Sequence, residues 1–291
     1  MGLPAFYSTL GKSTKKKCLL WLLPLLVLFC YCGYKLLSFI NKEFMVAEEL
    51  PYYDVGIRPD DDTLRVAIIG DSWAQWHATY NCDTLFERYW DKLTSKPIKC
   101  HSRGRGGAKT KEVYHYLFRS QTYEYSQEFP ICTQPLIEEH PDYCVIMAGI
   151  NDAWMKRSVS YYTGNYQLIL RLLLANRIRP VVMEIPDFDL TSFLERHKSV
   201  RTSFRIYSYF NGVVEDDVTP YRVGLIKMLK DNGFEDDVLF IPANHWLPNN
   251  HQFTEEIYQL DHTHLNDQGY HLLDSCMVSD IYCDYNLRAK K

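Results

Sequence analysis

Four short segments of this chain carry groups that together could cleave an ester. Gly70-Asp71-Ser72 supplies a hydroxyl, and Gly149-Ile150-Asn151-Asp152 supplies an amide and a carboxylate. Asp261-His262-Thr263-His264 places an acid three residues before a histidine. Gly104-Arg105-Gly106-Gly107 offers backbone amides next to residues without side chains. This set contains the groups that acyl transfer requires: a nucleophile, a base and hydrogen-bond donors.

Each group has a defined role in that chemistry. The hydroxyl of Ser72 is a weak nucleophile until a base takes its proton, and His264 is that base. Asp261 would fix the tautomer of the His264 ring and stabilise its cation. The amides of Ser72 and Gly107 and the side chain of Asn151 would donate to the oxyanion, and each such donor typically lowers the barrier by about 3 to 4 kcal/mol.

Taken one at a time, these segments have plain structural interpretations. Gly-Asp-Ser is a common helix cap, and Gly-x-Asn-Asp is most often a turn. Asp261 and His264 could form a loop hydrogen bond or half of a metal site. The hypothesis of a serine hydrolase depends on their order in the chain and on the elements that would carry them.

Short β-branched runs alternate with helical patterns along the chain, which predicts an α/β fold with a parallel sheet. Three of the four segments directly follow a predicted strand, and the carboxyl ends of parallel strands meet at one edge of the sheet. Residues 187–219 break this rhythm and are predicted to be an insertion. The predicted strands are 64–69, 97–101, 143–147, 180–185 and 238–241, and the predicted helices are 74–93, 109–119, 166–176, 221–231 and 267–278.

The amino terminus predicts a transmembrane anchor. Four lysines between Lys12 and Lys17 precede residues 18–40, a run of the length that a spanning helix needs. The basic cluster predicts a cytoplasmic amino terminus and a periplasmic or otherwise extracytoplasmic body. A cleaved signal peptide is disfavoured because no Ala-x-Ala pattern follows the run. The expected organisation is a tail over 1–17, the anchor over 18–40, a stem over 41–63 and a domain over 64–291.

Charge and composition exclude several classes of protein. The 291 residues are 46% hydrophobic and 23% charged, which argues against disorder. Residues 1–45 contain six of the 32 Lys and Arg but one of the 36 Asp and Glu, so the remainder carries 26 basic against 35 acidic residues. A body this acidic is a poor nucleic-acid binder, and none is expected as a partner.

The cysteines and histidines do not predict a metal site or a cofactor. Six of the nine cysteines lie outside the predicted anchor, an even number that permits disulfides but leaves the pairing open. No Cys-x-x-Cys pair is present, which argues against structural zinc. A cluster of His245, His251 and His264 is the metal alternative, although its spacing does not match a helical zinc motif.

The four segments, in this order, resemble those of the SGNH hydrolase superfamily, also called GDSL-like. The resemblance spans residues 64–280 and implies a flavodoxin-like three-layer α/β/α fold with metal-free ester hydrolysis or acyl transfer. It implies Ser72 as nucleophile with Asp261 and His264, and an oxyanion hole of Ser72, Gly107 and Asn151. Gly107 is preferred to Gly104 and Gly106 because it stands three residues before Thr110, which resembles the family's Gly-x-x-Thr/Ser pattern. Trp73, where the family motif usually has Leu, is expected to shape the acyl pocket, and Arg105 and Asp152 are further substrate-binding candidates.

The sequence therefore predicts a membrane-anchored serine esterase. Its expected partners are the membrane and an acetyl ester of an extracytoplasmic glycan or lipid. An O-acyltransferase would use the same triad and differ only in the second nucleophile. An inactive glycan-binding module is the alternative from another class, since a fold alone does not guarantee activity.

Overall fold

The structure is a computed structural model that describes residues 10–122, 131–187, 209, 218–247 and 256–290. Most of the predicted insertion 187–219 lies outside these residues. The chain divides into two compact units, Met1–Met45 and Val46–Lys291. The first contains helix α1 (Leu10–Phe44), whose side chains are described over 24–40 and at Phe44. Among the residues whose side chains the structure describes, no helix is both long and apolar enough to cross a membrane.

The second unit is built on a five-stranded parallel sheet in the order β2-β1-β3-β4-β5. In open α/β sheets with this order the chain winds in opposite directions from β1 to β2 and from β1 to β3, and ligands bind at this switch point beyond the carboxyl ends. The strands are β1 (Leu64–Gly70), β2 (Ile98–Gly104), β3 (Tyr143–Met147), β4 (Arg179–Met183) and β5 (Leu239–Ile241).

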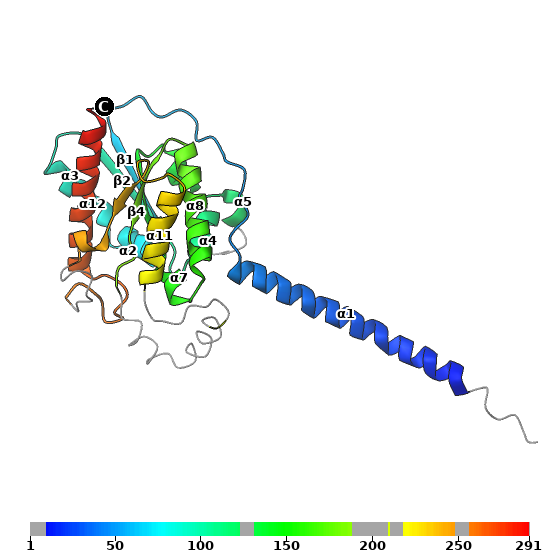
Figure 1. The fold of residues 1–291 in the computed structure, drawn as a ribbon. Coiled ribbons are helices and arrows are strands. Elements are labelled where there is room, and N and C mark those ends of the chain that lie inside the picture. The colour runs from blue at the N-terminus through cyan, green and yellow to red at the C-terminus, as the bar shows by residue number, and fades with distance from the viewer. Residues whose placement is uncertain (1–9, 123–130, 188–208, 210–217, 248–255, 291) are drawn as a thin grey trace, which may run out of the picture. The chain divides into compact units, whose positions relative to one another are not determined.

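Helices cover both faces of the sheet and make three layers (Figure 1). α3 (Cys82–Asp91) packs against α12 (Asp267–Arg288) on one face. α8 (Val159–Ala175) packs against α4 (Thr110–Tyr116) and α11 (Thr219–Asp231) on the other. The remaining short elements are α2 (Ser72–Thr79), α5 (Arg119–Thr122), α6 (Gln134–Glu138), α7 (Ile150–Trp154) and η1 (Ala243–His245).

The central strands are buried from both sides, which explains their unbroken apolar sequences. Every residue of β3 is buried, and Ile68, Ile69, Val181 and Val182 have no exposed surface. A strand covered by helices on both faces has no solvent side to select polar residues. The α/β fold with a parallel sheet agrees with the prediction from the sequence.

The helix predicted over 74–93 is two helices in the structure. Asn81 adopts a left-handed conformation with φ 56° and separates α2 from α3. Asn tolerates this conformation better than most residues. The helical pattern of the sequence therefore runs through Asn81 without showing that the helix breaks there. α8 and α12 are longer than predicted. α8 begins where Ser158 Oγ accepts a hydrogen bond from the Tyr161 amide at 3.1 Å.

Candidate active site

Ser72 begins α2 directly after a sharp turn at the end of β1. Gly70 has φ 156°, and a Cβ on it would lie 1.9 Å from the carbonyl oxygen of Met147. The amide of Asp71 donates to this same carbonyl at 2.9 Å. Glycine at position 70 therefore lets the ends of β1 and β3 approach closely, and this brings Ser72 toward the segment that follows β3.

Asp71 caps the helix that carries Ser72. Its Oδ1 accepts a hydrogen bond from the Trp73 amide at 3.0 Å, and its Oδ2 accepts from Asn151 Nδ2 at 3.3 Å. Burial raises the pKa of the Asp71 carboxyl to about 7, and the charge of Asp152 adds to the rise, against the lowering by these hydrogen bonds. Asp71 thus links the turn before Ser72 to α7, the short helix that follows β3.

Asp261 and His264 form a closely paired acid and base. Asp261 Oδ2 lies 2.5 Å from His264 Nδ1, and Asp261 Oδ1 accepts from the amides of Thr263 and His264 at 3.0 and 2.9 Å. Burial alone would raise the pKa of Asp261, but the hydrogen bonds from His264 and Thr263 outweigh it and lower the pKa. Because Nδ1 faces the carboxylate, Nε2 is the nitrogen left to act as a base.

Two contacts join the His264 loop to the helix of Ser72. Trp73 Nε1 donates to the carbonyl of Thr263 at 3.1 Å, and the ring centroids of Trp76 and His264 are 5.9 Å apart. Ser72 and Trp76 are one helical turn apart and share a face of α2. Among the described residues Ser72 Oγ makes no hydrogen bond. Ser72 and His264 are therefore not hydrogen-bonded to each other in this structure, as is common for catalytic pairs without substrate.

The loop after β2 leaves one amide without a partner among the described residues. That amide belongs to exposed Gly107, which has φ 76° and no atom within 4 Å of the point that a Cβ would occupy. From Arg105 to Thr110 the other amides donate in turn to Gly70 O, Gln75 Oε1, Arg105 O, Glu112 Oε2 and Asp152 Oδ2. Of the glycines considered, Gly106 has its amide engaged, which favours Gly107 as the donor.

The side chain of Asn151 already uses both of its N–H groups. Its Nδ2 donates to Ala108 O at 3.0 Å and to Asp71 Oδ2 at 3.3 Å. An oxyanion beside Ser72 would therefore have to replace one of these acceptors. The bond to Asp71 is at the long end of the hydrogen-bond range and is the easier one to exchange.

The two further substrate-binding candidates differ in their surroundings. Asp152 is fully buried, and its two oxygens accept from the amide and hydroxyl of Thr110 at 2.9 and 2.7 Å. Burial raises the pKa of Asp152 to about 6, although the bonds from Thr110 lower it. Asp152 therefore braces the start of α4 and exposes no surface to a substrate. Arg105 is half-buried in the loop that carries Gly107.

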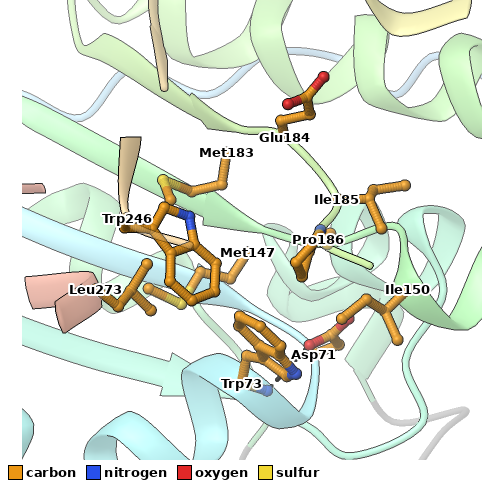
Figure 2. A pocket seen from close by; sticks show the side chains of 11 residues that line it. Asp71, Trp73, Met147, Ile150, Met183, Glu184, Ile185, Pro186, Trp246 and Leu273 are labelled. Atoms are coloured by element: carbon orange, nitrogen blue, oxygen red, sulfur yellow. Dashed lines mark hydrogen bonds between the residues drawn. The ribbon is translucent and has the colours of Figure 1, made fainter. Parts of the chain in front are cut away.

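Trp73 is buried and lines a cavity of about 20 Å³ at the carboxyl edge of the sheet. Figure 2 shows the indoles of Trp73 and Trp246 on one side of it and Pro186 and Ile150 on the other. The two indole rings meet edge to face, with centroids 5.7 Å apart. Two of its lining residues are chain neighbours of site residues, since Trp73 follows Ser72 and Ile150 precedes Asn151, and the cavity has room for roughly one small group.

A buried charged network lies on the opposite side of α2, and sequence reasoning missed it. His77 Nε2 lies 2.8 Å from Asp274 Oδ1, and His77 Nδ1 lies 3.1 Å from Asp83 Oδ1 and 2.7 Å from Ser102 Oγ. Burial opposes a charge on His77, but the two carboxylates outweigh it and raise the pKa of the imidazole to about 9. This ion-pair network fixes α2 to α3, β2 and α12.

Among the described residues, two groups of side chains have donor atoms close enough to hold a metal ion, and neither contains a residue of the proposed triad. One is buried and the other partly exposed: His77 with Cys82 and Asp274, and His245 with Cys276 and Asp280. Of the histidine cluster considered from the sequence, His245 pairs with Asp280, His264 pairs with Asp261, and His251 lies outside the described residues. The eight cysteines described are all free thiols.

Comparison with known proteins identifies the family. The family model of the GDSL-like lipase/acylhydrolases matches residues 68–272, and the chain belongs to this family of SGNH-type serine hydrolases. It is therefore an enzyme of the esterase and acylhydrolase class. No curated protein matches the chain significantly.

Solved structures of low sequence identity share the fold. The lipase/acylhydrolase from Enterococcus faecalis is 18% identical with a TM-score of 0.51, and the match covers 75% of this chain and 95% of that one. The psychrotrophic esterase EstA from Pseudoalteromonas sp. is 14% identical with a TM-score of 0.50, and the match covers 78% and 100%. These two structures share the α/β fold with most of this chain.

Proposed function

We propose that this protein is a serine esterase that removes acetyl groups from an extracytoplasmic glycan or lipid, with Ser72, His264 and Asp261 as its triad. The observation that carries this proposal is the 2.5 Å pairing of Asp261 with His264 on a loop tied to the helix of Ser72. Under this proposal, three chemically complementary groups from distant parts of the chain act together at the carboxyl edge of the sheet.

The reaction begins when His264 Nε2 takes the proton of Ser72 as the hydroxyl attacks the ester carbonyl. Negative charge then develops on the carbonyl oxygen, where the amides of Ser72 and Gly107 and the side chain of Asn151 would stabilise it. As the tetrahedral intermediate collapses, the bond to the alcohol oxygen breaks and His264 returns the proton to that oxygen. Water, activated by the same histidine, attacks the acyl-enzyme and releases acetate.

The cavity beside Trp73 supports a short acyl group. Its volume of about 20 Å³ suits a methyl group, and the indoles of Trp73 and Trp246 close it. Burying a longer chain there would require one of these buried rings to move, at the cost of its packing contacts. Acetyl is therefore the acyl group that fits the described residues best.

The test uses the full-length chain in detergent. Wild-type enzyme should hydrolyse an aryl acetate faster than the corresponding butyrate and should be labelled by a serine-directed fluorophosphonate. Ser72→Ala should lose both properties, whereas Ser95→Ala, which changes an exposed serine before β2, should keep them. Labelling and turnover that survive in Ser72→Ala would reject the proposed nucleophile. A chelator should leave the rate unchanged, since no step above uses a metal.

We also propose that residues 18–40 anchor the chain in a membrane, with residues 1–17 cytoplasmic and the catalytic unit periplasmic. The support is the apolar run itself and the lysines before it. The chain should stay in the membrane pellet after alkaline carbonate extraction, and external protease should digest its body in spheroplasts. Recovery in the soluble fraction, or a body protected like a cytoplasmic control, would contradict the anchor.

A further inference from the structure

Two aromatic side chains continue the face of α2 on which Ser72 lies. Trp76 and Tyr80 follow Ser72 at intervals of four residues, the spacing that aligns side chains along one side of a helix. Their rings are stacked, with centroids 5.2 Å apart and planes 29° from parallel. We call this pair the aromatic platform.

Packing against the core leaves part of this pair exposed, although Trp76 packs against the core and the ring of Tyr80 lies 6.0 Å, between centroids, from that of buried Tyr270. Tyr80 is 46% exposed, and Trp76 is partly exposed. Among the residues that the structure describes, Trp76 Nε1 donates to none. Gln259 Nε2 lies 3.3 Å from the Tyr80 hydroxyl and holds this ring at the edge of the site. Aromatic residues with a free polar group are typical of surfaces that bind amphipathic partners.

The position of His264 decides which part of a substrate meets the aromatic platform. The ring of Trp76 lies against that of His264. His264 returns its proton to the oxygen of the leaving alcohol, so this alcohol must lie on the same side of Ser72 as the platform. The small cavity lined by Trp73 receives the acyl group instead. The two halves of the ester are thereby separated.

We propose that Trp76 and Tyr80 form a subsite for the pyranose ring of a sugar that leaves as the alcohol. This inference rests on the proposed esterase function and selects the glycan over the lipid. A pyranose presents a face of C–H groups, which packs against the electron-rich outer face of a stacked aromatic pair, and hydroxyls at its rim that can accept from Trp76 Nε1. A flexible alkyl chain gains less from a planar ring, because it must lose its conformational freedom to lie flat on it.

The experiment compares acetate esters that share the acyl group and differ in the alcohol. The substrates are a panel of monoacetylated methyl pyranosides, ethyl acetate and octyl acetate, and the full-length enzyme is used. Trp76→Ala and Tyr80→Ala should lower kcat/KM on the pyranosides by roughly tenfold, mainly through KM, because they remove binding that ground state and transition state share. The rate of Tyr80→Ala on ethyl acetate should stay near wild type, and Trp76→Ala should lose more on the pyranosides than on ethyl acetate. Trp76→Phe, which keeps a planar ring, should restore most of the loss.

The control variant is Tyr52→Ala. Tyr52 has a similar exposure, 44%, and lines a cleft with Asp142 and Tyr143 at the amino end of β3, away from Ser72. It should behave as wild type on every ester. Thermal melts identify any variant that fails to fold, and Tyr80 is exposed enough for its replacement to be tolerated.

Three results would overturn the inference. An equal loss on ethyl acetate and on the pyranosides would mean that Trp76 only positions His264. A larger loss on octyl acetate would assign the platform to a lipid alcohol. Absence of a saturation-transfer NMR signal from acetylated pyranosides on Ser72→Ala would show that no sugar binds. If the wild type hydrolyses no ester, the esterase proposal fails by itself, and a pyranoside signal on Ser72→Ala that is lost with Tyr80→Ala would still support the subsite.

Discussion

Asp71 makes the stability of the protein depend on pH in a direction that can be tested. Its carboxyl is fully buried, and burial raises its pKa from 3.8 to about 7. A group whose pKa is higher in the folded than in the unfolded chain binds its proton more tightly in the folded state. The contribution of Asp71 to stability is therefore greatest in acid and falls as the pH rises from about 4 to about 7.

The size of this effect follows from the shift. A change from 3.8 to about 7 corresponds to about 4 kcal/mol over the whole range. Between pH 5 and pH 8 this stabilisation should fall by about 2 to 3 kcal/mol, because the rest of it is already lost below pH 5. Asp71→Asn removes the titration but keeps an oxygen that can cap α2 by accepting from the Trp73 amide.

The assay is urea denaturation of wild type and Asp71→Asn at pH 5 and pH 8. The free energy of unfolding should fall between these values by about 2 to 3 kcal/mol more in wild type than in the variant. The comparison uses the change in unfolding free energy between pH 5 and pH 8 in each protein, so any pH-independent cost of turning an amide toward Asn151 cancels. Asp152 is present in both proteins, so its contribution cancels as well. Asp61→Asn is the matched control, because Asp61 is exposed and its pKa is lowered to about 2, mainly by Arg65. Equal slopes in wild type and Asp71→Asn would refute the reasoning.

Three further substitutions test other parts of the site. Asn151→Ala should lower kcat by about a hundredfold or more with KM nearly unchanged in steady-state kinetics, and a change in KM alone would remove Asn151 from the oxyanion hole. Trp73→Ala should shift the preference from acetyl toward butyryl esters by enlarging the cavity, and an unaltered chain-length profile would place the acyl group elsewhere. His77→Gln should lower the free energy of unfolding by roughly 3 to 5 kcal/mol, because it leaves the buried Asp274 carboxylate without its counter-charge, and a melt like that of wild type would contradict the charged network.

The local character of the sequence determined the class of fold and the approximate position of each strand. Apolar runs such as 64–69 and 143–147 are long enough for strands and too short for buried helices, and a glycine follows each within two residues. The order of the segments around Ser72, Asn151 and His264 also pointed to a hydrolase, since three such segments rarely coincide by chance. Interactions between near neighbours in the chain produce the signals for strands and helices.

Several features of the site depend on the tertiary structure. Gln75 accepts the hydrogen bond of the Gly106 amide and thereby decides which glycine amide is left free. Asp71 and Ala108 accept the two hydrogen bonds of the Asn151 side-chain amide. The aromatic platform could have been found from its spacing to Ser72, but its position beside His264 could not.

The physical reason is the distance along the chain over which these contacts act. Trp73 and Thr263 are 190 residues apart, and His77 and Asp274 are 197 residues apart. No local preference encodes such pairs. They form because the parallel sheet brings the start of α2 and the start of α12 to the same edge, where burial then makes each unpaired polar group costly. The sequence alone specified which groups could react, and the packing of the folded chain decided which of them face one another.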